Sequence, residues 1–167
     1  IALYQPPGLY GDEAIPAMVR LWLRGHLYNY MGERFMERYD PNRMELADRD
    51  VLSTSIWREI KEGRGVPGGG VWLDTSFHAD KIIETVIADQ APDWNMRGHD
   101  LLKFGLDLRK EPLVVGPVVH FFCGGIKVKD TTWVTDIPGL YGCGESVGGV
   151  HGANRLPGGA LTETQVS

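Results

Sequence analysis

The chain has 167 residues and a formal net charge of −5, with 17 Lys and Arg against 22 Asp and Glu. That length suits one domain with a real core and is too short for a cofactor fold beside a separate substrate domain. Hydrophobic residues at 43% and charged residues at 23% exclude disorder, coiled coil and collagen, and the acidic balance argues against a nucleic-acid surface.

The first half of the chain carries mostly helical patterns. Residues 1–16 are expected to be extended with turns, because Gln5-Pro6-Pro7-Gly8 and Gly11-Asp12 interrupt any period. Apolar residues at helical spacing then favour a helix that Gly25 weakens, and these residues are Met18, Leu21, Trp22, Leu27 and Tyr28. Residues 32–39 are expected to form a short hairpin or turn, closed by Asp40-Pro41-Asn42.

The strongest helix prediction covers residues 45–62, and Gly63 is expected to stop it. Its apolar stripe consists of Leu46, Val51, Leu52, Ile56 and Ile60. A side-chain-poor loop of Gly63-Arg64-Gly65 and Gly68-Gly69-Gly70 follows, then a short strand at residues 71–73. Residues 80–88 predict a helix, and a second short helix is expected near residues 101–106.

From Pro112 the pattern changes to β-branched and aromatic residues separated by turn signals. Strands are expected at residues 113–122, 126–128, 133–135 and 140–141. A helix-rich first half and a strand- and glycine-rich second half predict an α+β fold, or one complete module joined to part of another.

Cysteine usage and hydropathy limit the class of protein further. Cys123 and Cys143 form no Cys-x-x-Cys pair, which argues against structural zinc, an iron–sulfur site or a disulfide framework and fits a reducing compartment. No stretch approaches the ~20 apolar residues of a membrane span. Because Ile1 opens neither a signal sequence nor a methionine start, we expect the chain to be cut from something longer.

Two isolated residues are candidates for chemistry. Arg64 lies between two glycines, so it is either a solvated turn arginine or a guanidinium able to reach over a bound anion. His120 ends an apolar run before Gly124-Gly125, so it is either a hydrogen-bonded core residue or a ligand-binding residue at a strand end.

The glycine-rich segment from Gly142 to Leu161 carries the densest signal. Gly142-x-Gly144-x-x-x-Gly148 after a strand is a weak match to a dinucleotide loop. Glu145 between glycines could supply a carboxylate for sugar hydroxyls where the backbone approaches a flat polar cofactor. A passive connection without a ligand is the alternative, and it does not account for the polar groups His151, Asn154 and Arg155.

Several motifs in a fixed order carry a family resemblance. They are Gly32-Glu33-Arg34-Phe35-Met36-Glu37-Arg38-Tyr39, Leu46-Ala47-x-Arg49-Asp50-Val51, Glu59-Ile60-x-Glu62-Gly63-Arg64-Gly65, Glu111-Pro112, Pro117-x-x-His120, Gly124-Gly125-Ile126, Ile137-Pro138-Gly139-Leu140-Tyr141, Gly144-Glu145 and His151-Gly152-Ala153-Asn154-Arg155-Leu156. Over nearly its whole length the chain resembles the flavoprotein subunit of succinate dehydrogenase and fumarate reductase, in a wider family that includes L-aspartate oxidase.

The resemblance implies a capping domain with a partial return into an FAD-binding domain. It places an entry segment at 1–16, the capping or substrate domain at 17–116 and part of the FAD-binding domain at 117–167. The Gly-x-Gly-x-x-Gly segment that holds the FAD pyrophosphate in this family is not within the chain. The fragment alone is therefore expected to be inactive and not to retain FAD.

The resemblance also implies roles for individual residues. Arg64 matches the cap arginine that passes the proton to or from the substrate carbon. Substrate carboxylates are expected at His120 and Arg155, with Gly124 and Gly125 in the same site. Contacts with the cofactor are expected from Gly144, Glu145, Asn154, Ala160 and Leu161, and no metal is expected.

The function implied for the parent protein is FAD-dependent interconversion of succinate and fumarate, or of a related organic acid. The exact substrate stays open, because Gln5, Ala17 and Met18 stand where the family usually has substrate-binding side chains. The alternatives are an isolated non-catalytic docking module and an L-aspartate oxidase-like enzyme. The expected partners are a small dicarboxylate, the rest of the FAD-binding domain and a candidate iron–sulfur subunit, with no nucleic acid and no membrane insertion. The expected location is the cytoplasm, peripheral to a membrane if partner subunits hold the protein there.

Overall fold

The computed structural model describes residues 1–5, 11, 13–90, 102 and 104–152. The chain divides into two compact units, Ile1–Val118 and Val119–Ser167, and each is described by itself.

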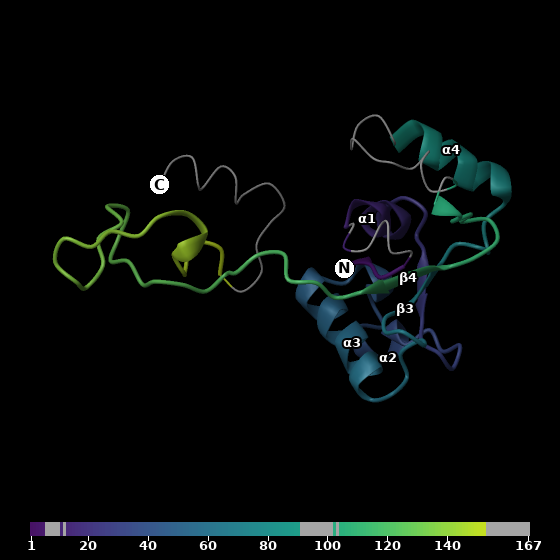
Figure 1. Ribbon diagram of the computed structural model, residues 1–167, viewed down its shortest axis with the longest axis horizontal. Helices are drawn as coiled ribbons and strands as arrows, with labels where there is room; N and C mark the ends of the chain where they lie inside the picture. The colour runs from purple at the N-terminus through teal and green to yellow at the C-terminus, as the bar shows by residue number, and fades with distance from the viewer. Residues whose placement is uncertain (6–10, 12, 91–101, 103, 153–167) are drawn as a thin grey trace. The chain divides into compact units, whose positions relative to one another are not determined.

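A four-stranded antiparallel sheet forms the centre of the first unit (Figure 1). Its strands are β1 (Ala2–Leu3), β2 (His26–Tyr28), β3 (Val71–Asp74) and β4 (Leu113–Gly116), in the spatial order β1-β4-β3-β2. Val71 lies opposite Val115, and Leu73 lies opposite Leu113 on β4 and Leu27 on β2. Because side chains alternate along a strand, these residues share one face, and all of them are buried.

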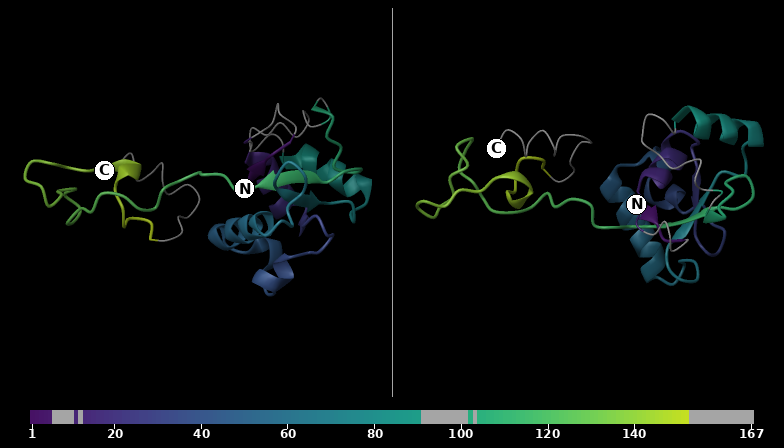
Figure 2. Two further views of the ribbon diagram at one scale, coloured as in Figure 1. Left: turned by 60° about the horizontal axis from the view of Figure 1, so that its bottom comes forward. Right: turned by 45° about the horizontal axis from the view of Figure 1, so that its top comes forward.

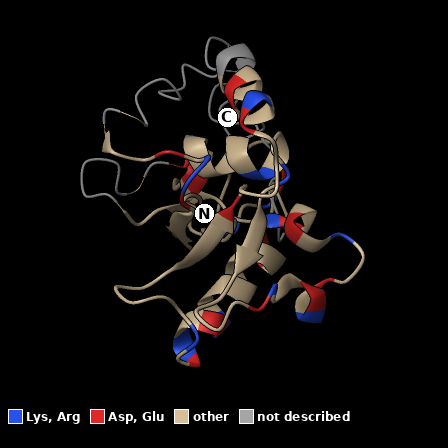
Figure 3. Cartoon of the chain, turned by 90° about the vertical axis from the view of Figure 1, so that its right-hand side faces the viewer, with Lys and Arg blue, Asp and Glu red and all other residues tan. Residues whose placement is uncertain are grey.

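Helices cover that buried face. They are α1 (Ala14–Leu21), α2 (Met36–Tyr39), the short 3₁₀ helix η2 (Met44–Leu46), α3 (Arg49–Lys61) and α4 (Asp80–Gln90). Helix α1 contacts β1 and β3, and α3 contacts β3 and β4, as the views in Figures 1 and 2 show. Met18, Leu52 and Ile56 from these helices join the strand residues in one core. Acidic and basic residues lie mixed on the helices in Figure 3.

The structure confirms the mixed helix and strand class and several predicted elements. Helix α4 and strand β3 lie where they were expected, and α3 ends before Gly63, whose φ of +79° is the left-handed conformation of a helix stop. The predicted helix near 101–106 includes residues 101 and 103, which lie outside the described residues.

Three predictions in the first half were wrong. Leu27 and Tyr28 belong to strand β2, because α1 ends at Leu21 and the chain turns at Gly25, where a Cβ atom would lie 2.9 Å from the Leu73 side chain. Residues 36–39 form helix α2 instead of a turn. The long helix begins at Arg49 and not at residue 45, because the extended backbone of Asp48, with ψ of 154°, separates η2 from α3.

The second unit contains less regular structure than its β-rich sequence predicts. Strand β4 ends at Gly116, and residues 117–125 form no strand. Of the strands expected at 126–128, 133–135 and 140–141, the described residues show only two isolated β-bridges, Ile126 with Val147 and Val134 with Tyr141. The same part of the chain contains a 3₁₀ helix, η4 (Gly144–Ser146). Val and Phe have high β propensity, but Val119 and Phe122 are more than half exposed. No packed sheet face buries these side chains, so their propensity alone does not produce a strand.

Tyr4 fixes the end of strand β4. Its ring lies where a Cβ atom of Gly116 would have to be, and its hydroxyl donates to the Pro117 carbonyl at 2.7 Å. The Tyr4 N–H also donates to the Val114 carbonyl at 2.9 Å. Glycine at 116 is therefore required by the close approach of an aromatic ring.

Candidate functional site

Arg64 takes its position from the end of helix α3. The Arg64 N–H donates to the Glu59 carbonyl at 2.8 Å, and the Gly63 N–H donates to the Ile60 carbonyl at 3.1 Å. This pair of bonds, with Gly63 left-handed, is a Schellman motif. The motif turns the chain back over the last helical turn, so the Arg64 side chain returns to the Glu59 side chain.

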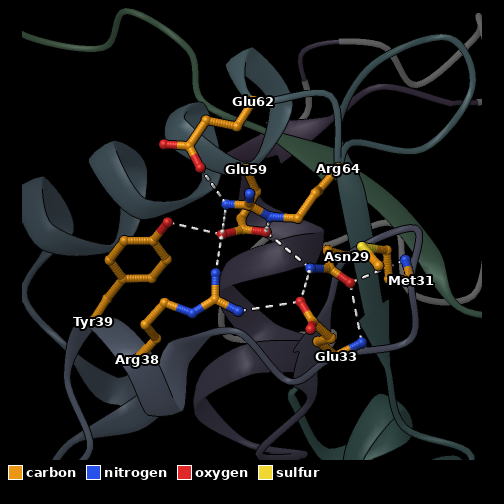
Figure 4. Close-up of polar contacts among 8 residues, drawn as sticks. All are labelled: Asn29, Met31, Glu33, Arg38, Tyr39, Glu59, Glu62 and Arg64. Carbon is orange, nitrogen blue, oxygen red and sulfur yellow. Dashed lines mark hydrogen bonds and ion pairs between the residues drawn. The ribbon is translucent and has the colours of Figure 1, made fainter.

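The guanidinium of Arg64 is held by two carboxylates (Figure 4). Its Nε and Nη2 donate to the two oxygens of Glu59 at 2.7 and 2.8 Å, and Nη2 also donates to Glu62 at 2.6 Å. Two parallel bonds between a guanidinium and a carboxylate give both strength and fixed geometry. These hydrogen bonds, first those to Glu59 and then that to Glu62, raise the pKa of Arg64 above its ordinary value.

The Glu59 carboxylate is fully buried and accepts bonds at both oxygens. Besides Arg64, it receives the Tyr39 hydroxyl at 2.7 Å and the Asn29 amide at 2.9 Å, and Arg38 lies 3.6 Å away. Burial alone raises the pKa of Glu59, but the hydrogen bonds from Arg64, Asn29 and Tyr39 outweigh it and lower this pKa to about 2. A carboxylate occupied in this way has no lone pair to serve as a general base.

Asn29 links the same cluster to strand β2. Its amide nitrogen donates to Glu59 and to Glu33, and its amide oxygen accepts the N–H groups of Met31 and Glu33, at distances from 2.8 to 3.0 Å. The Tyr30 N–H donates to the Arg64 carbonyl at 2.8 Å. We name Asn29, Glu33, Arg38, Tyr39, Glu59, Glu62 and Arg64 the Glu59 cluster, which joins β2, α2, α3 and the following loop.

The sequence pattern did not reveal this cluster. It singled out Arg64 because of its flanking glycines, but gave Asn29, Tyr39 and Glu59 no polar role. A signal was available, because a left-handed Gly63 after a helix brings Arg64 over residue 59. In its observed geometry Arg64 is a structural cation, and its predicted role in proton transfer stays a prediction.

Arg20 and Arg49 of the first unit are not neutralised in this way. Arg20, on α1, is half-buried and donates to the backbone carbonyl of Glu45 at 2.7 Å. The Glu45 carboxylate is instead bound by Arg34, through Nε at 2.9 Å and Nη2 at 2.7 Å. Arg49 is exposed at the start of α3, and in the described part of the chain neither Arg20 nor Arg49 forms an ion pair with a carboxylate. Burial lowers the pKa of Arg20, and the like charge of Arg49 lowers it further.

In the second unit, the structure brings together two predicted segments. The Phe122 N–H, two residues after His120, donates to Oε1 of Glu145 at 2.8 Å. The Ile126 N–H donates to the Ser146 carbonyl at 2.8 Å, and the Gly148 N–H donates to the Ile126 carbonyl at 3.1 Å. The segment predicted to bind substrate therefore lies against the turn predicted to contact the cofactor.

Two glycines make this contact possible. A Cβ atom on Gly125 would collide with the Ser146 carbonyl, and one on Gly148 would lie 2.6 Å from the Gly125 nitrogen. Such distances essentially exclude a side chain at either position. Gly124, by contrast, has open space at its Cβ position.

The described residues of this turn fit the polar side of a flavin cofactor. Gly144 has a left-handed φ of 62°, and η4 places Glu145 in an exposed position. No described residue donates a hydrogen bond to Oε2 of Glu145, and a carboxylate oxygen can accept one from a hydroxyl. His120 is exposed, and the predicted positions Asn154, Arg155, Ala160 and Leu161 lie outside the described residues.

The described residues contain no group of three or more His, Cys, Asp or Glu side chains that could hold a metal ion. None of their helices has the length and hydropathy of a membrane span.

Comparison with known proteins decides the family. Residues 3–161 match the family described as FAD binding domain. The chain belongs to the FAD binding domain family. FAD is therefore the cofactor that this family membership identifies.

Members of this FAD-binding family with similar sequences are longer than this chain. An uncharacterized FAD-dependent oxidoreductase of Methanocaldococcus jannaschii is 45% identical over 98% of this chain and 29% of its own length. A fumarate reductase (CoM/CoB) subunit of Methanothermobacter marburgensis is 43% identical over 98% of this chain and 29% of its own length. The chain therefore spans less than a third of these curated relatives.

A solved structure of the FAD-binding family agrees with the fold. E. coli quinol fumarate reductase has a TM-score of 0.69 and 29% identity, over 99% of this chain and 29% of its own. The resemblance to fumarate reductase and succinate dehydrogenase flavoproteins is thereby confirmed at the family level.

Proposed function

We propose that this chain is part of an FAD-dependent oxidoreductase that interconverts succinate and fumarate or a related unsaturated organic acid. The match to an FAD-binding family, with a fumarate reductase relative at 43% identity, supports the proposal. The geometry that carries it is the contact between the Glu145 turn and the segment after His120. This hydrogen bond supports the proposal because it would bring a cofactor-binding turn next to a substrate-binding segment.

In this reaction the chain has two tasks, to bind the dicarboxylate and to transfer a proton. Oxidation of succinate removes a hydride and a proton, and bound FAD would supply the hydride acceptor, so the chain's own residues have to bind the dianion and take the proton. We propose that His120 and Arg155 hold the substrate carboxylates, because a guanidinium matches a carboxylate with two parallel bonds. Gly124 and Gly125 would allow the backbone to approach the substrate closely.

Arg64 and Arg49 are rival candidates for the proton transfer. Arg64 fits the motif, but its two carboxylate partners hold its proton more tightly than in a free arginine. Arg49 is exposed and forms no ion pair with a carboxylate within the described residues. We propose Arg49 as the alternative, because it lies in the motif Leu46-Ala47-x-Arg49-Asp50-Val51 and no carboxylate of the described residues neutralises it.

The test uses the complete flavoprotein with reduced viologen as electron donor. We expect stoichiometric FAD and turnover of fumarate, whereas a protein loaded with FAD but inert toward a panel of unsaturated acids would refute the proposal. In the same assay, Arg49→Lys should abolish most turnover at unchanged FAD content, and Arg64→Lys should retain more. The reverse order would restore Arg64 as the proton-transfer residue.

Two alternative functions remain, and the same assay distinguishes them. Ala17 and Met18 carry no polar side chain at positions where the family usually binds substrate, so fumarate is not the certain substrate. An L-aspartate oxidase-like activity is favoured if fumarate is inert and an amino dicarboxylate is oxidised. A non-catalytic docking module is favoured if the protein purifies colourless. A cytoplasmic location, peripheral attachment through partner subunits and association with an iron–sulfur subunit belong to the proposal for the whole protein.

A further inference from the structure

In the second unit, the Glu145 side chain joins the two predicted segments. Glu145 lies in η4, in the turn proposed to face the cofactor, and its Oε1 accepts the Phe122 N–H at 2.8 Å. Phe122 lies midway between His120 and Gly124-Gly125 in the sequence. Residues 117–125 form no strand, so this bond acts on a stretch without the support of a sheet.

The backbone beyond Phe122 reinforces the same contact. Ile126 bonds to Ser146 and Gly148 in both directions, and Gly125 and Gly148 pack without side chains between them. Residues 145–148 therefore help to restrain the 120–125 segment, to which His151 adds a ring contact with Phe121 at 5.4 Å between centroids. A change in the conformation of the Glu145 side chain would act on Phe122 directly.

We propose that Glu145 is a positioning residue for the substrate-binding segment as well as a contact of the cofactor. Oε1 accepts the Phe122 N–H and no described residue donates a hydrogen bond to Oε2, so a cofactor bound at Oε2 would restrain the rotamer that positions His120 and Gly124-Gly125. Substrate affinity then depends on a residue that does not touch the substrate. This inference rests on the proposed function.

The experiment compares three variants of the complete flavoprotein, assayed at saturating FAD. Glu145→Ala removes the acceptor for Phe122, whereas Glu145→Gln keeps an oxygen that can accept the same bond. Gly148→Ala leaves the carboxylate in place but sets a methyl group against the Gly125 backbone. Asp136→Ala is the control, because it removes an exposed carboxylate of the same unit whose nearest cation, Lys129, is 3.7 Å away.

We expect Glu145→Ala to raise the KM for fumarate roughly threefold to tenfold, with kcat within about twofold, since one hydrogen bond to a charged group is lost. Glu145→Gln should raise KM less than Glu145→Ala does, because it keeps an acceptor for the Phe122 N–H, and Gly148→Ala should raise KM at full FAD content. The Asp136→Ala control should change neither constant.

Equal KM values for Glu145→Ala and Glu145→Gln would overturn the inference. If Glu145→Ala holds no FAD, Gly148→Ala decides the question, and an unchanged KM in that variant overturns the inference. If the unmodified protein has FAD but reduces no unsaturated acid, the proposed function fails and the inference fails with it. An active enzyme whose KM is insensitive to all three variants refutes the inference alone.

Discussion

At the scale of single residues, Glu59 shows how a buried carboxylate can have both of its oxygens hydrogen-bonded. Moving a carboxylate out of water is costly unless its lone pairs are satisfied. Glu59 meets this condition through Arg64, Asn29 and Tyr39. The folded state therefore favours the ionised form of Glu59, and removing this charge should lower the free energy of unfolding.

We predict that the protein loses stability in acid through Glu59. Its folded pKa of about 2 lies below the ordinary value of 4.5, so its contribution is fully present above pH 4.5 and is lost as the pH falls toward 2. Glu59→Gln should lower the free energy of unfolding at pH 7 by about 3 kcal/mol, because the Arg64 cation loses its buried partner. Urea denaturation at several pH values measures both effects.

Glu62→Gln is the matched control for that measurement. It removes a carboxylate that contacts the same Arg64 guanidinium, but the Glu62 side chain is 55% exposed. An exposed ion pair contributes at most about 1 kcal/mol. Equal losses in the two variants would show that burial of Glu59 does not set the energetics of the cluster.

At the scale of elements, the end of helix α3 depends on the left-handed Gly63. No atom lies within 4 Å of the position of a Cβ there, so a side chain meets backbone strain and no steric obstacle. We predict that Gly63→Ala lowers the free energy of unfolding by about 1 kcal/mol, with a smaller loss for Gly63→Asn and a larger loss for Gly63→Val. Thermal or urea denaturation of the three variants gives the order. A stability for Gly63→Ala equal to that of the unmodified protein would mean that the left-handed turn is not required.

The elements that could be predicted from sequence are those with local signals. Helix α3 has an apolar stripe with a glycine stop, and β3 is a short apolar run after a glycine loop. Strand β2 has only three residues, His26–Tyr28, and becomes a strand through its pairing with β3. That pairing is a tertiary interaction with no local signal, so the helical spacing of the apolar residues wrongly placed Leu27 and Tyr28 in a helix.

The candidate site was predictable in the same partial way. Glycines at 125 and 148 indicated close backbone contact, and the structure shows what each of them contacts. The bond from Phe122 to Glu145 joins residues far apart in sequence and has no local pattern. Burial of Glu59 was equally hidden, because a glutamate on a helix is usually exposed.

At the scale of the whole molecule, the two units differ in how much apolar surface they bury. The first has a continuous core between the sheet and its helices. In the described part of the second, apolar side chains such as Phe122 and Tyr141 are about two-thirds exposed. A unit with few buried contacts opens at a lower free energy than one with a packed core.

We predict that amide hydrogen exchange separates the two units of this chain. Amides of β3, β4 and α3 should be protected far longer than the bridge amides of Ile126 and Gly148. In the complete flavoprotein, protection at Ile126 and Gly148 should rise if the rest of an FAD-binding domain covers the exposed apolar residues. Equal protection of both units in the isolated chain would contradict this prediction.

The pairing of β1 with β4 makes the first unit suitable for insertion into a larger protein. Ala2 lies opposite Gly116 and Leu3 opposite Val115, so the polypeptide enters and leaves the first unit through neighbouring strands. Paired residues on antiparallel strands lie about 5 Å apart. A host protein could therefore accommodate all of residues 1–118 at a single point of its surface, as it would a hairpin loop, without separating its own flanking segments.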